Sequence, residues 1–552
     1  MNQVKIFALG GLDEDGKNMY CVDVNGSIFV IEAGLKYPDN EGLGIEMIIP
    51  DTNYLIENAQ RVKAIFITHG HEDVMAALPN LLKQIKVPVY TAPLTAEILE
   101  SNLKKENITG YKINRIKRND EFVVENHSII TFGVTQSIAD GFGVAIGTPS
   151  GYVVYTSEFI IDYDTQTPSF YTEIDQFTEI GKKGVLALLA ESVGATRVGH
   201  TAPHHRITSL IEQDFEDATD RIVITMYHQN LYRVIEVVEL ANKYHKKIVF
   251  MDAELRKLMK TVSDLGYYNM PPGMEISKER YNQDMRDVVV IVSGDGSTIF
   301  KKIHKIATKA DDFLEFRPSD TIIIASPAVP GTEREATKME NDLYKEGATI
   351  HSVVSKEMFS MHASIEDLKM MLYLFKPKYY IPVKGQYRQL IANANIALKM
   401  GYSHKEILVL DNGQIANFVD GTLKDNSDII KLEEVLVDGK ANLDTSGMVL
   451  RDRDTLSTEG TIIVGIVVDF KTKEVIGGPD VQSRGVIYLK DSEHVIKMAG
   501  EILEETIKNA VKEKRYENAS CRLEARDKII KYIIKETGKR PMVLPAIIEI
   551  RT

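Results

Sequence analysis

Several residue types and patterns that mark common protein classes are scarce in this chain of 552 residues. It has two cysteines, Cys21 and Cys521, which rules out a disulfide scaffold and a zinc site built from cysteines. No apolar run approaches the roughly 20 residues of a membrane span, and residues 1–10 lack the apolar stretch of a signal peptide. We therefore expect a cytoplasmic protein that has no membrane partner.

Positive charge is also in short supply. Asp and Glu number 79 against 66 Lys and Arg, which gives a net charge of −13. Taken alone, this balance argues against a nucleic-acid ligand, because phosphate-binding proteins usually carry a basic surface. The 13 histidines are unremarkable in number, so any chemistry they perform must show in their spacing.

The hydrophobic pattern predicts units of different kinds along the chain. Short β-rich segments bounded by turn residues fill the first 206 residues, and residues 207–352 alternate helices with strands, as parallel α/β domains do. Residues 426–448 are rich in Asp, Gly, Asn and Lys and indicate a linker. The predicted strands are 4–8, 28–31, 64–68, 128–134, 152–156, 221–226, 247–251, 288–292, 321–325, 379–383, 461–469, 474–476 and 543–550, and the predicted helices are 74–84, 233–244, 365–375, 492–515 and 521–535.

One short motif carries metal-site chemistry. The predicted strand at 64–68 runs into His69, Gly70, His71, Glu72 and Asp73. Because side chains alternate along an extended chain, His69 and His71 project to one face, and Asp73 can join them at the turn into the next helix. Two imidazoles and a carboxylate are the ligands of hydrolytic zinc or manganese sites. The alternative is that one histidine caps the helix and the other packs in the core.

Residues 66–73 (F-I-T-H-G-H-E-D) resemble the second motif of metallo-β-lactamase-fold hydrolases, and more closely the L-T-H-G-H-E-D-H of ribonuclease J in the β-CASP branch. The resemblance extends over the whole chain. Further matching segments are 9–11 with 16–19, 31–35 (I-E-A-G-L), 154–159 (V-Y-T-S-E-F), 327–331 (P-A-V-P-G), 376–383 (K-P-K-Y-Y-I-P-V), 449–453, 482–485 and 539–541.

The resemblance implies an α/β fold: a metallo-β-lactamase αββα sandwich with an inserted β-CASP parallel α/β domain and a small α+β C-terminal domain. On this basis we expect the sandwich at 1–206 and 353–425, the β-CASP domain at 207–352, the linker at 426–448 and a C-terminal oligomerisation domain at 449–552. The family's activity would be metal-dependent cleavage of RNA, from the 5′ end and internally, with two metals between the first two domains.

This chain departs from the family at the metal ligands. His69, His71 and Asp73 match the family, and Glu158 stands where the family has a bridging aspartate. Three ligand histidines are replaced, by Val74, Gln136 and Lys384, and two supporting aspartates by Glu32 and Glu191. We expect one zinc or manganese ion at most, weakly bound, and no two-metal centre, because valine cannot ligate and a protonated lysine repels a dication.

The ammonium of Lys384 is a candidate replacement for the second metal ion. In the family's geometry it would lie near Asp73 and Glu158 and neutralise both carboxylates. The alternative is that Lys384 points to solvent.

The segments that bind RNA in the family are also only partly matched in this chain. The resemblance assigns RNA binding to Ser360, His362, Ser364, Asn230 and Arg233, and catalysis, if the chain is active, to Asp73, Glu191 and His362. Segments 252–255 and 293–299 depart from the family's phosphate-binding motifs. The basic stretch 301–305 offers phosphate contacts or is only a solvated helix face. His200, His204 and His205 are expected at the surface.

Two functions follow from this pattern. The first is a ribonuclease J-like protein of the second, degenerate paralogue type, which acts in RNA processing and mRNA decay as a partner or scaffold subunit of an active ribonuclease J. Its partners would be RNA, single-stranded or 5′-monophosphorylated, and a second copy or the active paralogue. The alternative is an active 5′–3′ exo- and endoribonuclease with a reduced metal site, slowed by loss of its acid–base histidines.

Overall fold

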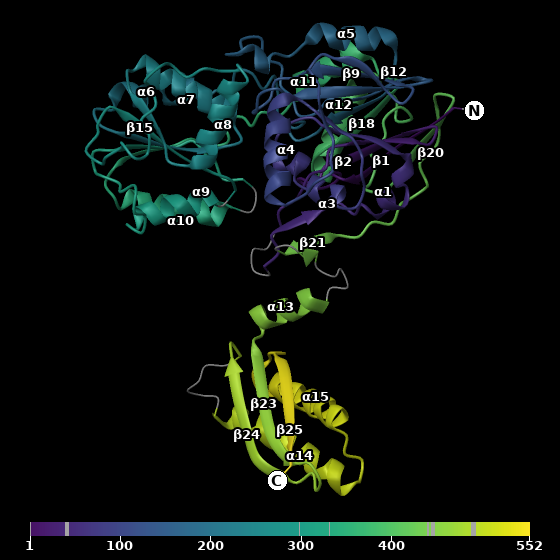
Figure 1. Cartoon of the computed structure of the whole chain (residues 1–552), viewed down its shortest axis with the longest axis vertical. Helices are drawn as coiled ribbons and strands as arrows, with labels where there is room; N and C mark the ends of the chain where they lie inside the picture. Colours follow the sequence, from purple (N-terminus) through teal and green to yellow (C-terminus); the bar gives the residue numbers. More distant parts are fainter. Residues whose placement is uncertain are drawn as a thin grey trace. The chain divides into compact units, whose positions relative to one another are not determined.

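The computed structural model describes residues 2–38, 44–296, 298–329, 332–438, 441–442, 448–486 and 493–551. The chain forms two compact units, the first made of Met1–Tyr37 with Ile48–Glu434 and the second of Pro38–Met47 with Val435–Thr552 (Figure 1). Among the described residues, no helix is both long and apolar enough to cross a bilayer.

Two mixed sheets form the centre of the first unit. One has eight strands in the order β20-β19-β1-β2-β3-β5-β6-β7, and the other has six in the order β18-β12-β11-β10-β9-β8. Side chains of β1, β2 and β3 pack against those of β9, β10 and β12 in one shared core, so the sheets lie face to face. The strands of these sheets are β1 Gln3–Gly10, β2 Met19–Val24, β3 Ser27–Ile31, β5 Val62–Ile67, β6 Val89–Thr91, β7 Ile113–Arg115, β8 Glu121–Val124, β9 His127–Gly133, β10 Phe142–Thr148, β11 Gly151–Tyr155, β12 Val185–Glu191, β18 Tyr379–Val383, β19 Ala416–Val419 and β20 Thr422–Asp425, and β4 Met47–Ile49 lies outside them.

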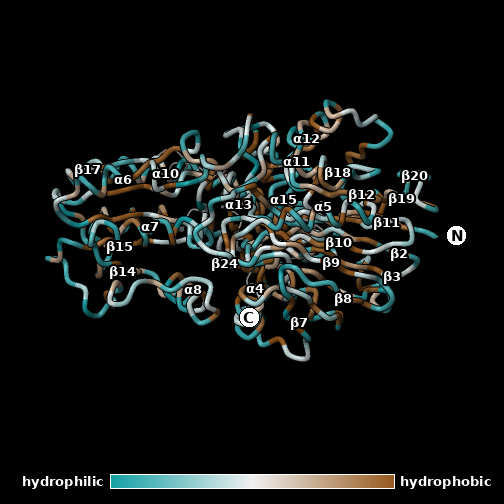
Figure 2. Tube along the Cα trace, turned by 90° about the horizontal axis from the view of Figure 1, so that it is seen from above, coloured by the Kyte–Doolittle hydropathy of each residue, from teal (hydrophilic) through white to brown (hydrophobic). Residues whose placement is uncertain are grey.

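Helices cover the outer face of each sheet. The eight-stranded sheet packs on α1 Asn53–Glu57, α3 Leu78–Leu82 and α4 Pro93–Lys105, and the six-stranded sheet on α5 Ile174–Lys183, α11 Ile365–Phe375 and α12 Tyr387–Lys399. Figure 2 shows the hydrophobic stretches running along the strands. This is the αββα sandwich that the resemblance implies.

A parallel α/β domain is inserted between β12 and β18. Its five strands, in the order β14-β15-β13-β16-β17, pair only in parallel. Helices α6, α7 and α8 pack on one face and α9 and α10 on the other. The elements are α6 Thr208–Asp217, β13 Ile222–Tyr227, α7 Leu231–Lys243, β14 Lys247–Phe250, α8 Ala253–Asp264, β15 Val288–Gly294, α9 Thr298–Ala307, β16 Thr321–Ile324, α10 Glu333–Tyr344 and β17 Thr349–Ser352.

The second unit contains a three-stranded sheet with two long helices. The strand order is β24-β23-β25, and residues of α14 and α15 pack on one face of the sheet. The elements of this unit are β21 Val435–Asp438, β22 Ala441–Asn442, α13 Met448–Thr458, β23 Thr461–Asp469, β24 Val475–Arg484, α14 Glu493–Lys512, α15 Asn518–Thr537 and β25 Met542–Ile550.

Three predictions about local structure were wrong. The helix predicted at 74–84 is two short helices, α2 Glu72–Met75 and α3, with Pro79 in the first turn of α3. Proline has no N–H to continue the hydrogen-bond ladder, so a new helix starts there. The predicted linker contains β21 paired antiparallel with β22. The strand predicted at 474–476 extends to Arg484 as β24. Its partner strand β23 is preceded by helix α13, which was not predicted.

Candidate metal centre

The predicted ligands meet where strands of both sheets end. His69 and His71 follow β5, Glu158 follows β11, Glu191 ends β12 and Lys384 follows β18. Segments more than 300 residues apart in sequence thus contribute to one site, because β18 pairs with β12 and β12 with β11.

Glu158 lies between the two histidines of the motif. His69 Nε2 is 3.5 Å from Glu158 Oε1, and His71 Nδ1 is 3.5 Å from Glu158 Oε2. One ligand atom from each of these residues lies within 4.8 Å of the others, a spacing that suits one metal ion. His69 Nε2 is buried and has no hydrogen-bond partner within the described part of the chain. His71 stands at the N-cap position of α2 but makes no side-chain capping hydrogen bond, so ligation by the two histidines remains a prediction that this geometry suits.

The rings of both histidines are oriented by hydroxyl groups. His69 Nδ1 is 2.9 Å from Thr68 Oγ1 and 3.3 Å from Ser157 Oγ, and Ser137 Oγ is 3.0 Å from His71 Nε2. A partner on the far nitrogen holds the ring and leaves the nearer nitrogen available as a ligand. Burial lowers the pKa of His69, which keeps that imidazole in its neutral, ligating form. The motif at 66–73 did not reveal Ser137 and Ser157.

Lys384 lies beside the site and contacts two of its carboxylates. Its Nζ is 2.7 Å from Asp73 Oδ2 and also hydrogen-bonds to Glu158. The side chain is 6% exposed, so the solvent-pointing alternative is wrong. Asn18 Nδ2 donates a second hydrogen bond to Asp73 Oδ2 at 3.0 Å, so the aspartate is held from two sides.

Each charge of this ion pair stabilises the ionised form of the other. Burial acts to lower the pKa of Lys384, but the charges of Asp73 and Glu158 outweigh it and raise that pKa well above its ordinary value. Burial acts in the opposite direction on Glu158, and Lys384 holds the pKa of that carboxyl well below its usual range. Lys384 is therefore an ammonium, and both carboxylates are ionised.

The backbone fixes the position of Lys384. It follows the buried strand β18, adopts a positive φ of 54° and donates its N–H to the carbonyl of Gly11 at 3.0 Å. A lysine rarely adopts this left-handed conformation, and here it turns the chain at the site instead of continuing the strand.

Glu191 and His362 form a second pair next to Glu158. His362 Nδ1 is 2.6 Å from Glu191 Oε2 and 4.0 Å from Glu158 Oε2. Glu191 also accepts hydrogen bonds from the N–H groups of Phe159 and Ala363, at 2.9 Å and 3.0 Å. Glu191 thus contacts the His362 ring directly and the backbone of the next residue, Ala363, and is itself fully buried.

The positions where the family's other ligands and supporting aspartates stand do not provide good metal ligands in this chain. Val74 is fully buried in the apolar core around α2 and α3. Gln136 is fully buried, and neither its Nε2 nor its Oε1 has a hydrogen-bond partner in the described residues. Glu32, at one of the family's aspartate positions, bonds to the N–H and hydroxyl of Thr68, and burial raises its pKa to about 8.

Three of the predicted RNA-binding residues have contacts within the protein. Asn230 caps α7 by accepting from the N–H of Arg233. The Arg233 guanidinium, buried, donates to the carbonyls of His205 and Phe359. Ser364 forms the capping box of α11 with Asp367.

Ser360 is exposed and His362 is partly exposed, as is Asn230. The loop that carries Ser360 and His362 is tied down through its backbone, because Arg197 donates to the carbonyls of both residues. Ser364 by contrast is fully buried. RNA binding by these residues remains a prediction.

The expected surface position of the histidines at 200–205 was correct for His200 and His204 and wrong for His205. His205 is fully buried, with Nε2 3.2 Å from Asp162 Oδ2. Arg206 pairs with the same carboxylate at 3.1 Å. A histidine run in a loop carried no signal for this contact, which ties the segment before α6 to the loop after β11.

A cleft of about 860 Å³ opens beside the motif, lined by residues of both domains of the first unit. Its wall includes Glu72, His228, Glu254 and Asp295. Burial raises the pKa of Asp295 to about 7, helped by the negative charges of Glu72 and Glu254. The lining also includes Lys104, Lys105 and Lys257, so the cleft carries charges of both signs.

The donor set fits one metal ion and not two. His69, His71 and Glu158 present two nitrogens and a carboxylate to one point, and the unpartnered, buried His69 Nε2 is the atom that an ion would satisfy. At the second position the ammonium of Lys384 already contacts Asp73 and Glu158, and its positive charge excludes a dication.

Comparison with known proteins matches four segments of the chain. Family models match a beta-lactamase superfamily domain at residues 47–230, a ribonuclease J beta-CASP domain at 219–343, a Zn-dependent metallo-hydrolase RNA specificity domain at 349–408 and a ribonuclease J C-terminal domain at 448–550.

Curated relatives match over nearly the full length. The chain is 32% identical over 550 residues to proteins named Ribonuclease J 2 from Staphylococcus saprophyticus and Staphylococcus aureus, covering 99% of this chain and 98% of each relative. A crystal structure of a protein of unknown function from Enterococcus faecalis is similar in fold, with a TM-score of 0.52 and 16% identity over 75% of this chain and all of that one. The chain therefore belongs to the ribonuclease J family of metallo-β-lactamase-fold, RNA-processing proteins.

Proposed function

We propose that this protein acts in RNA processing and mRNA decay as a partner subunit of an active ribonuclease J, with little or no catalysis of its own. The observation that carries the proposal is the buried ammonium of Lys384 between Asp73 and Glu158. A tethered cation balances the charge of the two carboxylates. It cannot activate a water molecule as a bound metal does.

The rest of the site supports the same proposal. His362 and Glu191 keep their mutual hydrogen bond, so the architecture around the centre is retained while ligands are lost. We infer that the fold is maintained for assembly and for positioning, and that the phosphodiester chemistry belongs to the partner.

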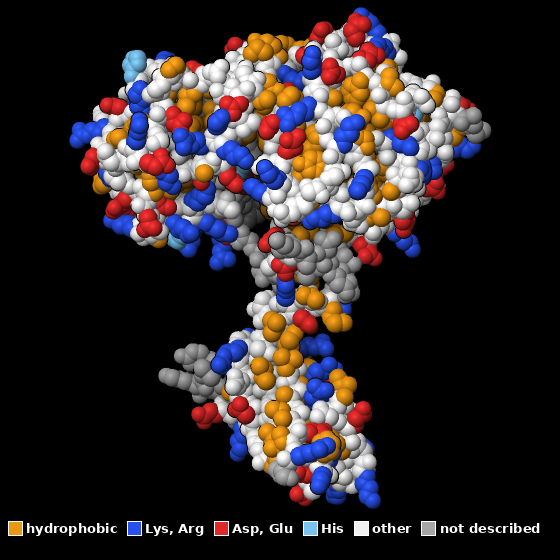
Figure 3. Space-filling model, viewed as in Figure 1, with side chains coloured by type: hydrophobic (Ala, Val, Ile, Leu, Met, Phe, Trp, Pro, Cys, Tyr) orange, Lys and Arg blue, Asp and Glu red, His pale blue; other side chains and the backbone are white. Residues whose placement is uncertain are grey.

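An open face of the C-terminal sheet supports an association with another chain. Helices α14 and α15 cover one face of this sheet. On the other face, Ile463, Leu544 and Ile548 are 44%, 48% and 55% exposed, and Ile463 lies opposite Leu544 in the register. Figure 3 shows hydrophobic side chains gathered along this unit. Such an apolar face is typical of a protein–protein contact.

A second candidate function rests on the intact triad. His69, His71 and Glu158 can hold one ion, which would supply a Lewis acid and a bound water, and His362 lies close enough to Glu158 to exchange a proton with a group there. This candidate is a slow, one-metal ribonuclease that retains the family's activity at a rate reduced by orders of magnitude.

One experiment separates the two functions. Purified protein is incubated with Mn²⁺ and a 5′-monophosphorylated RNA, alone and with an active ribonuclease J, while bound metal is measured by mass spectrometry. We expect at most one weakly bound ion per chain and no cleavage above background by the isolated chain. His404→Ala, an exposed histidine far from the motif in sequence, is the control variant.

The variant Lys384→His tests the role of the ammonium directly. Restoring a ligand in place of a charge should raise metal content by one ion per chain. Rapid digestion by the isolated wild-type chain, or two stoichiometric ions in it, would overturn the proposal.

A further inference from the structure

Helices α9 and α10 of the inserted domain carry an exposed basic surface on a chain that is acidic as a whole. The two helices pack against each other, and His304 of α9 pairs with Asp342 of α10 at 2.7 Å. We call the exposed side chains Lys301, Lys305, Arg334, Lys338 and Lys345 the α9–α10 basic surface.

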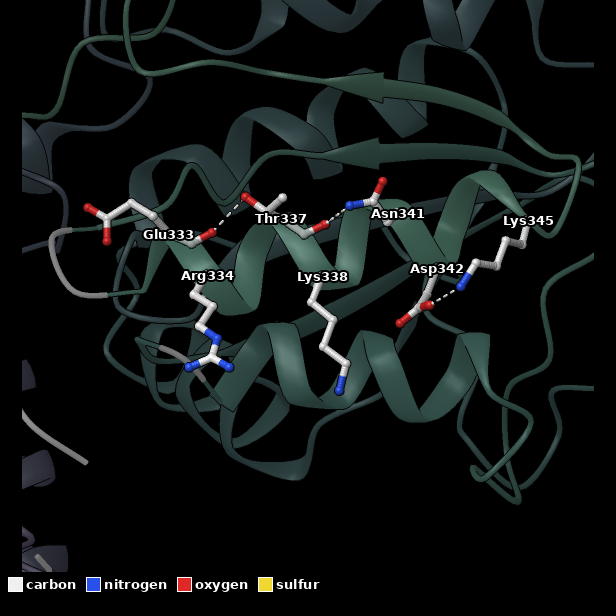
Figure 4. A pocket seen from close by; sticks show the side chains of 7 residues that line it. All are labelled: Glu333, Arg334, Thr337, Lys338, Asn341, Asp342 and Lys345. Atoms are coloured by element: carbon white, nitrogen blue, oxygen red, sulfur yellow. Dashed lines mark hydrogen bonds and ion pairs between the residues drawn. The ribbon is translucent and has the colours of Figure 1, made fainter. Parts of the chain in front are cut away.

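Helical geometry aligns these residues. The positions 301 and 305, and the positions 334 and 338, are four residues apart, and 345 follows seven later. Residues at i, i+4 and i+11 lie on one face of an α-helix, about 6 Å apart for each i+4 step. Figure 4 shows Arg334 and Lys338 extending from the same side of α10.

The buried side of α9 explains why only part of its basic stretch belongs to the surface. Ile299, Ile303 and Ile306 face the core of the domain. Lys302 is partly exposed but is engaged within the domain, where it pairs with Asp252 and donates to the carbonyl of Ser293 at 2.7 Å. Lys301 and Lys305 point away from that core and are exposed, which the sequence alone could not distinguish.

Several of the charges on this surface are available to a ligand. Lys345, 71% exposed, pairs with Asp342 at 2.7 Å, and that aspartate is also shared with His304. Lys305, Arg334 and Lys338 form no ion pair within the described residues. Tyr344, at the same end of α10 as Lys345, is 63% exposed, and an exposed aromatic ring can stack on a base.

We propose that the α9–α10 basic surface binds single-stranded RNA through its phosphates, at a place separate from the metal centre. Two rows of positive charge at about 6 Å spacing follow an extended sugar–phosphate backbone, and the adjacent tyrosine offers a stacking platform. The inference rests on the proposed function only in taking RNA as the ligand. A partner subunit without catalysis would use such a surface to hold RNA for an active enzyme.

The test uses the full chain and a fluorescein-labelled oligouridylate of about 20 nucleotides, long enough to span both helices. Fluorescence anisotropy gives Kd at several salt concentrations. Lys305→Gln/Arg334→Gln/Lys338→Gln should weaken binding by about tenfold at low salt. It should also flatten the slope of log Kd against log salt by about 2, because each phosphate contact on a single strand contributes about 0.7.

A matched control removes the same charge elsewhere. Lys405→Gln/Lys424→Gln/Lys431→Gln changes three exposed lysines of the first unit outside the inserted domain and should leave Kd and slope nearly unchanged. Equal effects of the two triple variants, or none from the first, would overturn the inference. So would tighter binding of a decaglutamate peptide than of the RNA, since the surface would then suit an acidic protein. Metal content and cleavage, measured in parallel, test the proposed function separately.

Discussion

Lys384 donates a hydrogen bond to Asp73 across 311 residues of sequence, with Nζ 2.7 Å from Oδ2, and contacts Glu158 as well. Both partners of the pair with Glu158 are buried, at 6% and 5% exposure, so its loss should be costly. Two negative charges would remain in a site that has lost its cation.

The substitution Lys384→Met keeps most of the side-chain volume and removes the charge. Breaking a buried ion pair from one side typically costs about 3–5 kcal/mol, so we expect a loss of this order in the free energy of unfolding, measured by chemical denaturation. Lys405→Met, at an exposed position, should change it little. The double variant Lys384→Met/Glu158→Gln should recover part of the loss, and an additive double variant would refute the pairing.

Removal of a triad ligand should abolish the remaining metal affinity. His69→Ala or His71→Ala takes one of three donors from the group with Glu158, and two donors rarely hold zinc. Isothermal titration calorimetry with zinc should show binding to the wild type and to His404→Ala, and no binding to either ligand variant. Unchanged zinc affinity in the two variants would place the ion elsewhere.

Arg233 should matter for stability more than for RNA. Its buried guanidinium donates to the carbonyls of His205 and Phe359, and each acceptor left unsatisfied costs about 1–3 kcal/mol. We expect Arg233→Met to lower the free energy of unfolding by about 3 kcal/mol. Oligouridylate affinity at a temperature where the variant is folded should remain within about twofold; a selective loss of RNA binding would instead support the contact predicted from the sequence.

Asp140 should make stability fall as pH rises. Burial raises its pKa to about 6, although Tyr267 and the N–H of Leu94 donate hydrogen bonds to it. Since the unfolded pKa is near 4, the folded state binds the proton more tightly, and stability is lost between about pH 4 and pH 6.

We expect Asp140→Asn to remove this pH dependence, worth up to about 3 kcal/mol. Unfolding free energies at pH 4.5 and pH 7.5 should therefore differ less in the variant than in the wild type. Asp284→Asn, at an exposed aspartate, serves as the control. An unchanged pH dependence in Asp140→Asn would contradict the assignment.

The open face of the C-terminal sheet should mediate self-association or association with a paralogue. Leu544→Glu/Ile548→Glu places two charges on that face, at positions that are 48% and 55% exposed. We expect sedimentation velocity to show dissociation to the monomer without loss of the folded unit. Leu523→Glu, on α15 and 53% exposed, should leave the assembly intact.

Much of the local structure was predictable because it depends on local patterns. Strands such as β3 and β5 and the long helices α14 and α15 follow from runs and periodicities that the chain carries within a few residues. The break between α2 and α3 was missed because the apolar spacing continues across Pro79 and only the missing N–H interrupts it.

The sequence by itself determined which ligands of the metal centre persist, because His69, His71 and Asp73 stand in one motif and the substitutions can be read position by position. It also determined that a lysine had replaced a ligand. The sequence showed neither where the side chain of that lysine points nor that Ser137 orients His71, because the groups concerned are far apart in sequence.

Only the tertiary structure decided those points. The pairing of β18 with β12 and of β12 with β11 brings Lys384 to Glu158, and a backbone hydrogen bond to Gly11 holds it there. Burial in this packed environment makes the ion pair strong and makes a dication at the same place unfavourable. The chemical identity of each group is local, whereas its contacts and charge state depend on what the fold places beside it.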